Sequence, residues 1–379
     1  MLKPIATIVT GLIFLIFLAI LTVGTAGHAA VGSDSAPLLS TFHSQPERLE
    51  AELQRHLAWA DAGGWPRVPD GPTIRPGAPD PRLAILARRL AISGDLSEDI
   101  PSVSKSEYGE VLEDAVRRFQ ERHALDVDGL VGHATLRALN VSIERRIGQL
   151  RVNIARMRRF LDEPMDKLLV VNIAAFNAYV VRDGAIIWTT RVIVGETEDK
   201  TPEFRSDIKH VVFNPTWSVP HSIASEEILP KIKHDPGFLR KGAYELYDRE
   251  GNAVDPAGVD WSMVSTGNFP FTLVQRPGPQ NQLGQIKFMF PNEYSICMHD
   301  TPERALFAKA VRALSHGCIR VQEPRELAAV ILDSEGWSRQ RIDSQIESGE
   351  TRSLTLSELL PLFVLYWTAE VDDSGRLHF

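Results

Sequence analysis

The chain has 379 residues, of which 44% are hydrophobic and 24% are charged, and its formal net charge is −8. A chain of this length has room for two domains and further segments. The ordinary apolar fraction excludes a disordered chain, and the scattered basic residues argue against a nucleic-acid-binding protein, which needs a basic face.

The first thirty residues, 1–30, have the features of a targeting segment. Lys3 precedes an uncharged apolar run over 5–23, and residues 24–30 are mostly small. This order predicts a secretory signal. The run also reaches the roughly 20 residues that span a bilayer, so a retained inner-membrane anchor is an equal alternative, and a buried core helix is a third. The first two both predict export to the periplasm or another part of the cell envelope.

Residues 31–81 should form one helix and a linker. Apolar residues recur with a helical period over 45–62, and two glycines, Gly63 and Gly64, should end the helix. The tract over 66–81 is rich in Pro and Gly, which break regular structure, so we expect a linker there.

Residues 82–142 should form a small helical domain. Apolar stripes at helical spacing lie over 83–90, 111–119 and 130–139. Helices this short need mutual packing to be stable. The next segment, 143–166, contains a connecting helix. We expect its arginines on the outer face, either in solvent or against an acidic polymer: Arg145, Arg146, Arg151, Arg156, Arg158 and Arg159.

From Lys167 the hydrophobic period changes to two, which predicts strands with a turn at Asp183 and Gly184. Residues 167–346 therefore have the size and pattern of a sheet-based domain, and 347–379 of a C-terminal extension. Helix, loop, Pro and Gly interrupt the strand pattern over 221–279. Further strands are expected over 209–213, 271–275, 286–290 and 294–299, and helices over 223–232, 304–313 and 324–332.

The chain has only two cysteines, Cys297 and Cys318. Two are too few for a disulfide scaffold, although one disulfide between them stays open. Cys and His residues show no zinc-site spacing, so we expect no metal and no cofactor.

Cys318 ends the string Ser315-His316-Gly317-Cys318, and His299 lies upstream at the end of a predicted strand. A thiolate is a strong nucleophile, and a neighbouring imidazole can take the proton of the thiol. We expect the intervening helix to return the chain beside the strand of His299. Gly317 allows close backbone approach, and the N–H groups of Gly317 and Cys318 could then face an oxyanion. The alternative is a small, buried cysteine without a catalytic role.

Two family resemblances follow from these motifs. The region over 108–140 resembles the peptidoglycan-binding domain of cell-wall enzymes, through 115–120, 125–129 and Gly132 with Thr135 and Leu136; a generic three-helix bundle is the alternative. The region from residue 82 to 379 resembles the L,D-transpeptidases with a YkuD-type domain, in their larger periplasmic branch. That resemblance lies in His299 followed by 315–318, and in further stretches in the same order: 214–220, 275–281, 290–292, 299–302 and 366–369.

The resemblance implies an α+β fold, with a small three-helix peptidoglycan-binding domain before a β-rich YkuD-type catalytic domain. The insertion over 221–279 would cap the active site and gate substrate entry. Cys318 would be the nucleophile and His299 the proton acceptor and donor, with the backbone carbonyl of Asp300 orienting its ring. Ser315, His316 and Gly317 would shape the loop and the oxyanion site, and Arg320 and Trp217 would contact substrate.

Other roles for these residues stay open. His316 could be the base, although it lies only two residues from Cys318. The carboxylate of Asp300 could act as an acid or base, Arg320 could form a surface ion pair, and Trp217 could line the core or the cleft.

The implied activity is L,D-transpeptidation of peptidoglycan stem peptides. A tetrapeptide donor would form a thioester, and a diaminopimelate side-chain amine on a neighbouring stem would accept it. Carbapenems would acylate the same cysteine. The alternatives are L,D-carboxypeptidase activity with water as acceptor, attachment of a lipoprotein through a lysine, and a non-catalytic wall-binding protein.

Overall fold

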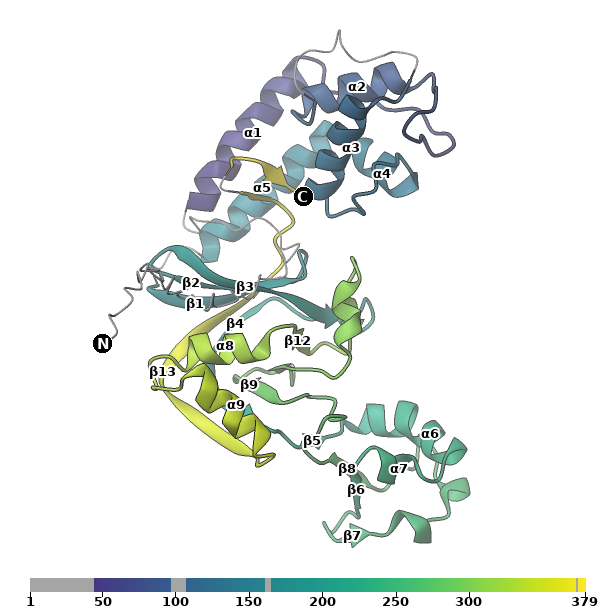
Figure 1. Ribbon diagram of the computed structural model, residues 1–379, viewed down its shortest axis with the longest axis vertical. Coiled ribbons are helices and arrows are strands. Elements are labelled where there is room, and N and C mark those ends of the chain that lie inside the picture. The colour runs from purple at the N-terminus through teal and green to yellow at the C-terminus, as the bar shows by residue number, and fades with distance from the viewer. Residues whose placement is uncertain (1–43, 97–106, 161–164, 373) are drawn as a thin grey trace, which may run out of the picture. The chain divides into compact units, whose positions relative to one another are not determined.

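The computed structural model describes residues 44–96, 107–160, 165–372 and 374–379 (Figure 1). The expected signal or anchor over 1–30 lies outside these residues. Within the described ranges, no helix is long and apolar enough to cross a membrane.

The N-terminal region is helical, as the apolar periodicity predicts. The long helix α1 (Gln45–Asp61) precedes three short ones, α2 (Leu83–Ile92), α3 (Glu110–Arg122) and α4 (His133–Leu139). The three short helices bury their apolar stripes against one another in a core of their own. They form a small helical domain, which confirms that expectation.

The Pro/Gly-rich tract over 66–81 is not a free linker. Val68 and Ile74 are buried in the core of the helical domain, and Ile74 forms a two-way backbone bridge with Val131. The side-chain amide of Asn140 holds the start of the tract. It donates to the carbonyl of Val68 and accepts from the N–H of Val68, both at 2.9 Å. The tract lacks helical and strand periodicity, yet its few apolar residues suffice to fix it to the domain.

The connecting helix α5 (Ile143–Phe160) packs against α1. Their shared apolar core includes Leu49 from α1 and Leu150 from α5. The expectation that all six arginines face outward is wrong for Arg146, which is 7% exposed. Its position matches the period of the apolar stripe, and the long side chain reaches a pocket described below.

The C-terminal half is built on one nine-stranded sheet with the order β11-β3-β12-β10-β9-β4-β13-β1-β2. Because β3 also pairs with β2, the sheet closes into a barrel. The long strand β3 makes this closure, since its first half pairs with β2 and its second half with β11 and β12. The strands are β1 (Lys167–Asn172), β2 (Asn177–Arg182), β3 (Ala185–Gly195), β4 (Phe204–Phe213), β9 (Ile286–Met289), β10 (Met298–His299), β11 (Ala313–Ser315), β12 (Ile319–Val321) and β13 (Arg352–Leu365).

Alternation along the strands divides the core into two clusters. Leu169 and Val171 of β1 face a cluster that also contains apolar residues of α8 (Pro324–Ile331) and α9 (Arg339–Glu347). Leu168 and Val170 face the opposite side, where α1 and α5 cover the sheet. This two-sided burial explains why residues 168–171 of β1 are all apolar rather than alternating.

The C-terminal segment expected as an extension over 347–379 contributes a central strand, β13, to the catalytic sheet, whereas residues 370–371 and 377–378 form a separate two-stranded sheet. Strand β13 lies between β1 and β4 in the sheet, parallel to β1 and antiparallel to β4. The expectation was wrong because helix α9 separates β13 from the other strands along the sequence, so its pairing partners are distant.

Two further sequence expectations change around the insertion and the catalytic loop. The predicted helix over 304–313 is a short 3-10 turn, Arg304–Ala308, followed by β11. The predicted helix over 223–232 starts as a π-helical segment, η3 (Ile223–Ile228), and continues as α6 (Leu229–His234).

The insertion that is expected to cap the active site has a small sheet (Figure 1). Its apolar residues form a core of their own. The strand order is β5-β8-β6-β7, and the apolar residues of η3 and α6 pack in the same cluster. The insertion begins earlier than expected, at Trp217. Its remaining elements are β5 (Trp217–Ser218), α7 (Phe238–Lys241), β6 (Tyr244–Tyr247), β7 (Ala253–Val254) and β8 (Thr272–Gln275).

Candidate active site

The candidate catalytic residues lie at two neighbouring parallel strands: His299 is the last residue of β10, and Cys318 immediately precedes β12. In their register His299 is opposite Arg320, and one residue earlier the N–H of Ile319 donates to the carbonyl of Cys297 at 3.0 Å. Because strand side chains alternate between faces, Cys297 and His299 point to the same side. The ring nitrogen of His299 and the two sulfur atoms of Cys297 and Cys318 lie within 4.8 Å of one another.

The imidazole of His299 is buried and held in one tautomer. Its Nδ1 lies 2.5 Å from the backbone carbonyl of Asp300, as the sequence analysis expects. A carbonyl oxygen only accepts, so Nδ1 carries the hydrogen and Nε2 is free to take a proton. The carboxylate of Asp300 is already engaged, since it accepts from the N–H of Gln285 at 2.9 Å and pairs with Arg304 at 3.2 Å. That leaves His299, not Asp300, to move protons.

The two thiols are free, half-buried and adjacent, with their Sγ atoms 3.7 Å apart. The backbone N–H of Cys297 also points at the sulfur of Cys318, at 3.5 Å. The thiol of Cys297, and then the ring of His299, hold the pKa of Cys318 well below its usual range. The same hydrogen bond to Cys318, together with burial, raises the pKa of Cys297. The pair therefore favours a thiolate at Cys318 and a thiol at Cys297.

Two side-chain hydroxyl groups hold the loop around the nucleophile: that of Ser315 at the end of β11, and that of Thr201 in the turn between β3 and β4. The hydroxyl of Ser315 donates to the carbonyl of Cys318 at 2.6 Å, and that of Thr201 donates to the carbonyl of Gly317 at 2.7 Å. The N–H of Gly195 at the end of β3 donates to the same Thr201 oxygen at 2.9 Å. The loop is thus held before any substrate arrives.

The glycine before the nucleophile is required for its backbone angle rather than for space. Gly317 has a φ of +98°, a region that disfavours other residues, but a Cβ there would meet only ordinary contacts. The close approach falls on Gly195, where a Cβ would come within 2.0 Å of the carbonyl of Asp199 and 2.9 Å of the Cα of Gly317. The sequence expectation of close approach at Gly317 is therefore corrected.

Two backbone N–H groups are available beside the sulfur. Within the described ranges, the N–H groups of Gly317 and Cys318 donate to no protein acceptor. Fixed, unpaired donors next to a nucleophile are suited to stabilise an oxyanion.

The contacts of His316 do not suit it to act as the base. Its Nε2 forms an ion pair with Glu227 of η3 at 2.9 Å, and its side chain is 46% exposed. This contact joins the catalytic loop to the capping insertion. Glu196 and Asp199 lie near the same ring, with their ligand atoms and that of His316 within 4.8 Å of one another.

The two expected substrate-binding residues have different surroundings. Arg320 lies on β12 opposite His299 and forms an ion pair with Glu303, so the surface ion pair considered from sequence exists. Trp217 lies on β5, where it packs with the core of the capping insertion and its ring is 6.5 Å from that of Tyr244.

Several site residues were not found from sequence. Thr201 and Gly195 sit in an ordinary strand-turn stretch, and no motif marks them. The contact of the Cys297 thiol with Cys318 depends on the pairing of β10 with β12. Cys297, His299 and Cys318 could also hold a thiophilic metal ion, and such an ion would occupy the sulfur of the candidate nucleophile.

Comparison with known families agrees with this geometry. The family model of the L,D-transpeptidase catalytic domain (YkuD) matches residues 166–338, and that of a "Putative peptidoglycan binding domain" matches residues 80–139. A Haemophilus influenzae protein named "Putative L,D-transpeptidase" is 36% identical over 227 residues, which cover 60% of this chain and 46% of that relative. The chain thus spans about half the length of the curated relative it matches.

Two solved structures of L,D-transpeptidases each match about half of the chain. An L,D-transpeptidase from Mycobacterium smegmatis matches with 14% identity and a TM-score of 0.25, over 53% of this chain and 58% of that chain. The catalytic domain of an E. faecium L,D-transpeptidase, acylated by ertapenem, matches with 10% identity and a TM-score of 0.24, over 54% of this chain and 99% of that chain.

Proposed function

Because residues 166–338 match the family model of the L,D-transpeptidase catalytic domain, we propose that Cys318 cross-links peptidoglycan stem peptides through a thioester acyl-enzyme. The observation that carries the proposal is the pairing of β10 with β12. It brings the sulfur of Cys318 beside a histidine whose Nε2 is free and whose Nδ1 is fixed by a carbonyl.

In the acylation step, the Cys318 thiolate attacks the carbonyl at the L-centre of diaminopimelate in a tetrapeptide donor. The N–H groups of Gly317 and Cys318 stabilise the oxyanion. The C–N bond to the terminal D-alanine then breaks, and His299 gives the departing amine the proton that the thiol lost.

In the transfer step, the side-chain amine of diaminopimelate on a second stem attacks the thioester carbon. The C–S bond breaks, and His299 takes a proton from the amine and returns it to the sulfur. Glu196 and Asp199, both exposed beside the catalytic loop, support an amine acceptor, because carboxylates attract a cationic amine to the entrance.

The same residues would serve hydrolysis or transfer to a lipoprotein lysine, and the acidic entrance favours an amine over water. A non-catalytic wall-binding role does not account for the fixed tautomer of His299 or for the lowered pKa of Cys318. Arg320, beside His299, would hold a substrate carboxylate once Glu303 releases it. Trp217 would contribute to substrate binding indirectly, by packing in the capping insertion.

The proposed setting is the periplasm. The apolar segment over 5–23 supports export by a cleaved signal or an inner-membrane anchor. The helical domain would bind peptidoglycan and keep the catalytic domain near its substrate. Carbapenems would acylate Cys318, as ertapenem acylates the E. faecium domain.

The test is to incubate the purified protein with tetrapeptide-rich sacculi and identify the muropeptides by mass spectrometry. Dimers joined between two diaminopimelate residues, with release of D-alanine, are the expected products. Tripeptide monomers alone would identify a carboxypeptidase instead, and unchanged muropeptides would contradict catalysis.

A further inference from the structure

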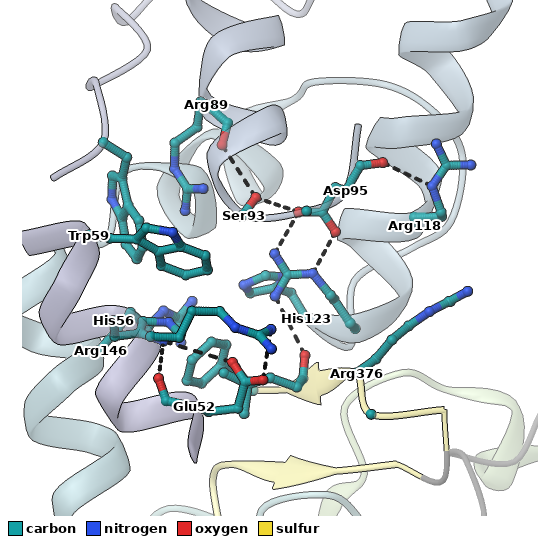
Figure 2. A pocket seen from close by; sticks show the side chains of 17 residues that line it. Glu52, His56, Trp59, Arg89, Ser93, Asp95, Arg118, His123, Arg146 and Arg376 are labelled. Carbon is teal, nitrogen blue, oxygen red and sulfur yellow. Dashed lines mark hydrogen bonds and ion pairs between the residues drawn. The ribbon is translucent and has the colours of Figure 1, made fainter. Parts of the chain in front are cut away.

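One pocket of the described residues is lined by none of the candidate active-site residues. It has a volume of about 150 Å³ and is lined by α1, α2, α3, α5 and the C-terminal residues (Figure 2). The C-terminal part here includes the short strands β14 (Glu370–Val371) and β15 (Leu377–His378). The pocket therefore joins the helical domain to elements that cover the catalytic sheet.

Arg89 of α2 is a buried cation without a carboxylate partner. It is 2% exposed, and its Nε donates to the backbone carbonyl of Leu139 at 2.9 Å. Its guanidinium lies 4.0 Å from the centre of the Trp65 ring, while Nη1 has no hydrogen-bond partner. Burial, and then the nearby charge of Arg122, lower the pKa of Arg89 to about 9, and the charge of Asp95 opposes this shift only in part.

Arg146 of α5 lines the same pocket in a similar state. It is 7% exposed, donates to the side-chain oxygen of Gln149 at 2.8 Å, and lies 3.9 Å from the centre of the Phe379 ring. Burial lowers its pKa to about 9 as well. Two buried guanidinium groups in one pocket repel each other unless an anion lies between them.

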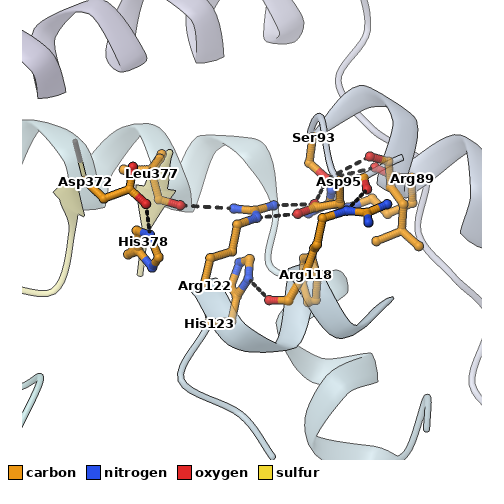
Figure 3. A network of polar contacts seen from close by, with 11 residues as sticks. Arg89, Ser93, Asp95, Arg118, Arg122, His123, Asp372, Leu377 and His378 are labelled. Carbon is orange, nitrogen blue, oxygen red and sulfur yellow. Dashed lines mark hydrogen bonds and ion pairs between the residues drawn. The ribbon is translucent and has the colours of Figure 1, made fainter. Parts of the chain in front are cut away.

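The carboxylates of the pocket are already engaged with other groups. Asp95 accepts two hydrogen bonds of 2.6 Å from Arg122 and one of 2.5 Å from Ser93 (Figure 3). Glu52 pairs with Arg55 at 2.9 Å, and burial raises its pKa. Within the described part of the chain, no carboxylate pairs with Arg89 or Arg146.

We propose that this pocket binds a small oxyanion, a carboxylate or phosphate group, through the guanidinium groups of Arg89 and Arg146. The unpaired Nη1 of Arg89 supplies a donor, and guanidinium groups recognise such anions through parallel N–H bonds. Aromatic faces position both groups: Trp65 under Arg89 and Phe379 under Arg146. The volume admits a terminal carboxylate or a phosphate.

The bound anion would stabilise the contact between the helical domain and the catalytic domain. Arg89 belongs to the former and Arg146 to the helix that covers the sheet. Removing the repulsion of two buried cations favours the arrangement in which both line one pocket. This role is independent of acyl transfer at Cys318.

The experiment measures thermal unfolding of the full chain in sodium acetate, sodium phosphate and sodium chloride at one ionic strength. We expect a saturable rise in Tm of about 2–4 °C in acetate or phosphate over chloride. A larger effect of acetate assigns the site to carboxylates, and a larger effect of phosphate assigns it to phosphate. Equal Tm values in all three salts would overturn the proposal.

Variants test the site directly. Arg89→Gln and Arg146→Gln should each abolish the anion-dependent rise, whereas Arg151→Gln should keep it, because Arg151 is exposed on the same helix as Arg146. If Arg89→Gln fails to fold, Arg146→Gln still decides. Retention of the full rise in Arg146→Gln, or its loss in Arg151→Gln, would contradict a site made by the two buried arginines.

Discussion

The sulfur of Cys297 lies 3.7 Å from the sulfur of Cys318, and the backbone N–H of Cys297 points at that same sulfur from 3.5 Å. One residue thus offers two donors to the nucleophile. Both favour the thiolate, which agrees with the lowered pKa of Cys318.

Cys297→Ala should raise the pKa of Cys318, because it removes the thiol donor and leaves the backbone one. The rate of Cys318 alkylation by iodoacetamide follows the thiolate, so its midpoint should move to higher pH by about 1–2 units, the worth of one hydrogen bond to a charged group. Peptide mapping across a pH series measures this. Cys297→Ser keeps a donor and should shift the midpoint less; an unmoved midpoint in Cys297→Ala would show that Cys297 does not stabilise the thiolate.

Cys318→Ala should abolish cross-linking while changing Tm by no more than about 2 °C, because the thiol is small and half-buried. Muropeptide analysis and calorimetry measure the two effects. In the unsubstituted protein, a carbapenem should add once, at Cys318, and intact mass with peptide mapping locates it. An adduct at Cys297, or full activity with the two cysteines joined by a disulfide, would refute the assignment of the nucleophile.

His299→Gln should lower kcat/KM far more than His316→Gln. Loss of the general acid and base should lower kcat/KM by roughly 10²–10⁴. Loss of the exposed His316–Glu227 pair should cost less than about tenfold, because such pairs contribute only about 0.2–1 kcal/mol. Steady-state kinetics with a tetrapeptide donor measures both. A greater loss in His316→Gln than in His299→Gln would exchange the two roles.

Gly195→Ala should destabilise the protein more than Gly317→Ala. A Cβ at Gly195 meets backbone atoms that cannot move aside cheaply, whereas the cost at Gly317 is a strained φ, of order 1–3 kcal/mol. Chemical denaturation gives both free energies of unfolding. Gly148→Ala in α5 serves as the control, since a Cβ there meets open space and alanine favours helix. Equal losses in the free energy of unfolding for the two variants would show that close backbone approach at Gly195 adds no cost.

A fragment over 65–141 should fold and co-sediment with sacculi, and a fragment over 82–140 should be less stable. The shorter one lacks Val68 and Ile74, whose burial stabilises by about 1.5–3 kcal/mol each. Thermal unfolding compares them, and sedimentation reports wall binding. A folded 65–141 fragment that stays in solution would leave a spacer domain in place of a wall-binding one.

Local patterns in the sequence determined the class of the fold and the identity of the candidate nucleophile. Helical stripes and period-two strands are short-range consequences of which side chains must be buried, so α2, α3, α4 and the β2–β3 hairpin follow from them. The Ser315–Cys318 string is likewise contiguous. To predict that Cys318 lies beside His299, only one assumption was needed: that the chain returns beside the strand of His299.

Tertiary structure alone decided the features that depend on pairing between distant segments. Three features depend on residues that no local pattern relates. They are the position of β13 inside the sheet, the hydrogen bond from Thr201 to the Gly317 carbonyl and the burial of Arg146. The same is true of the thiol pair, since Cys297 meets Cys318 only through the register of β10 on β12. Local propensity is set by neighbours along the chain, whereas strand register and buried charge are set by the packing of the whole domain.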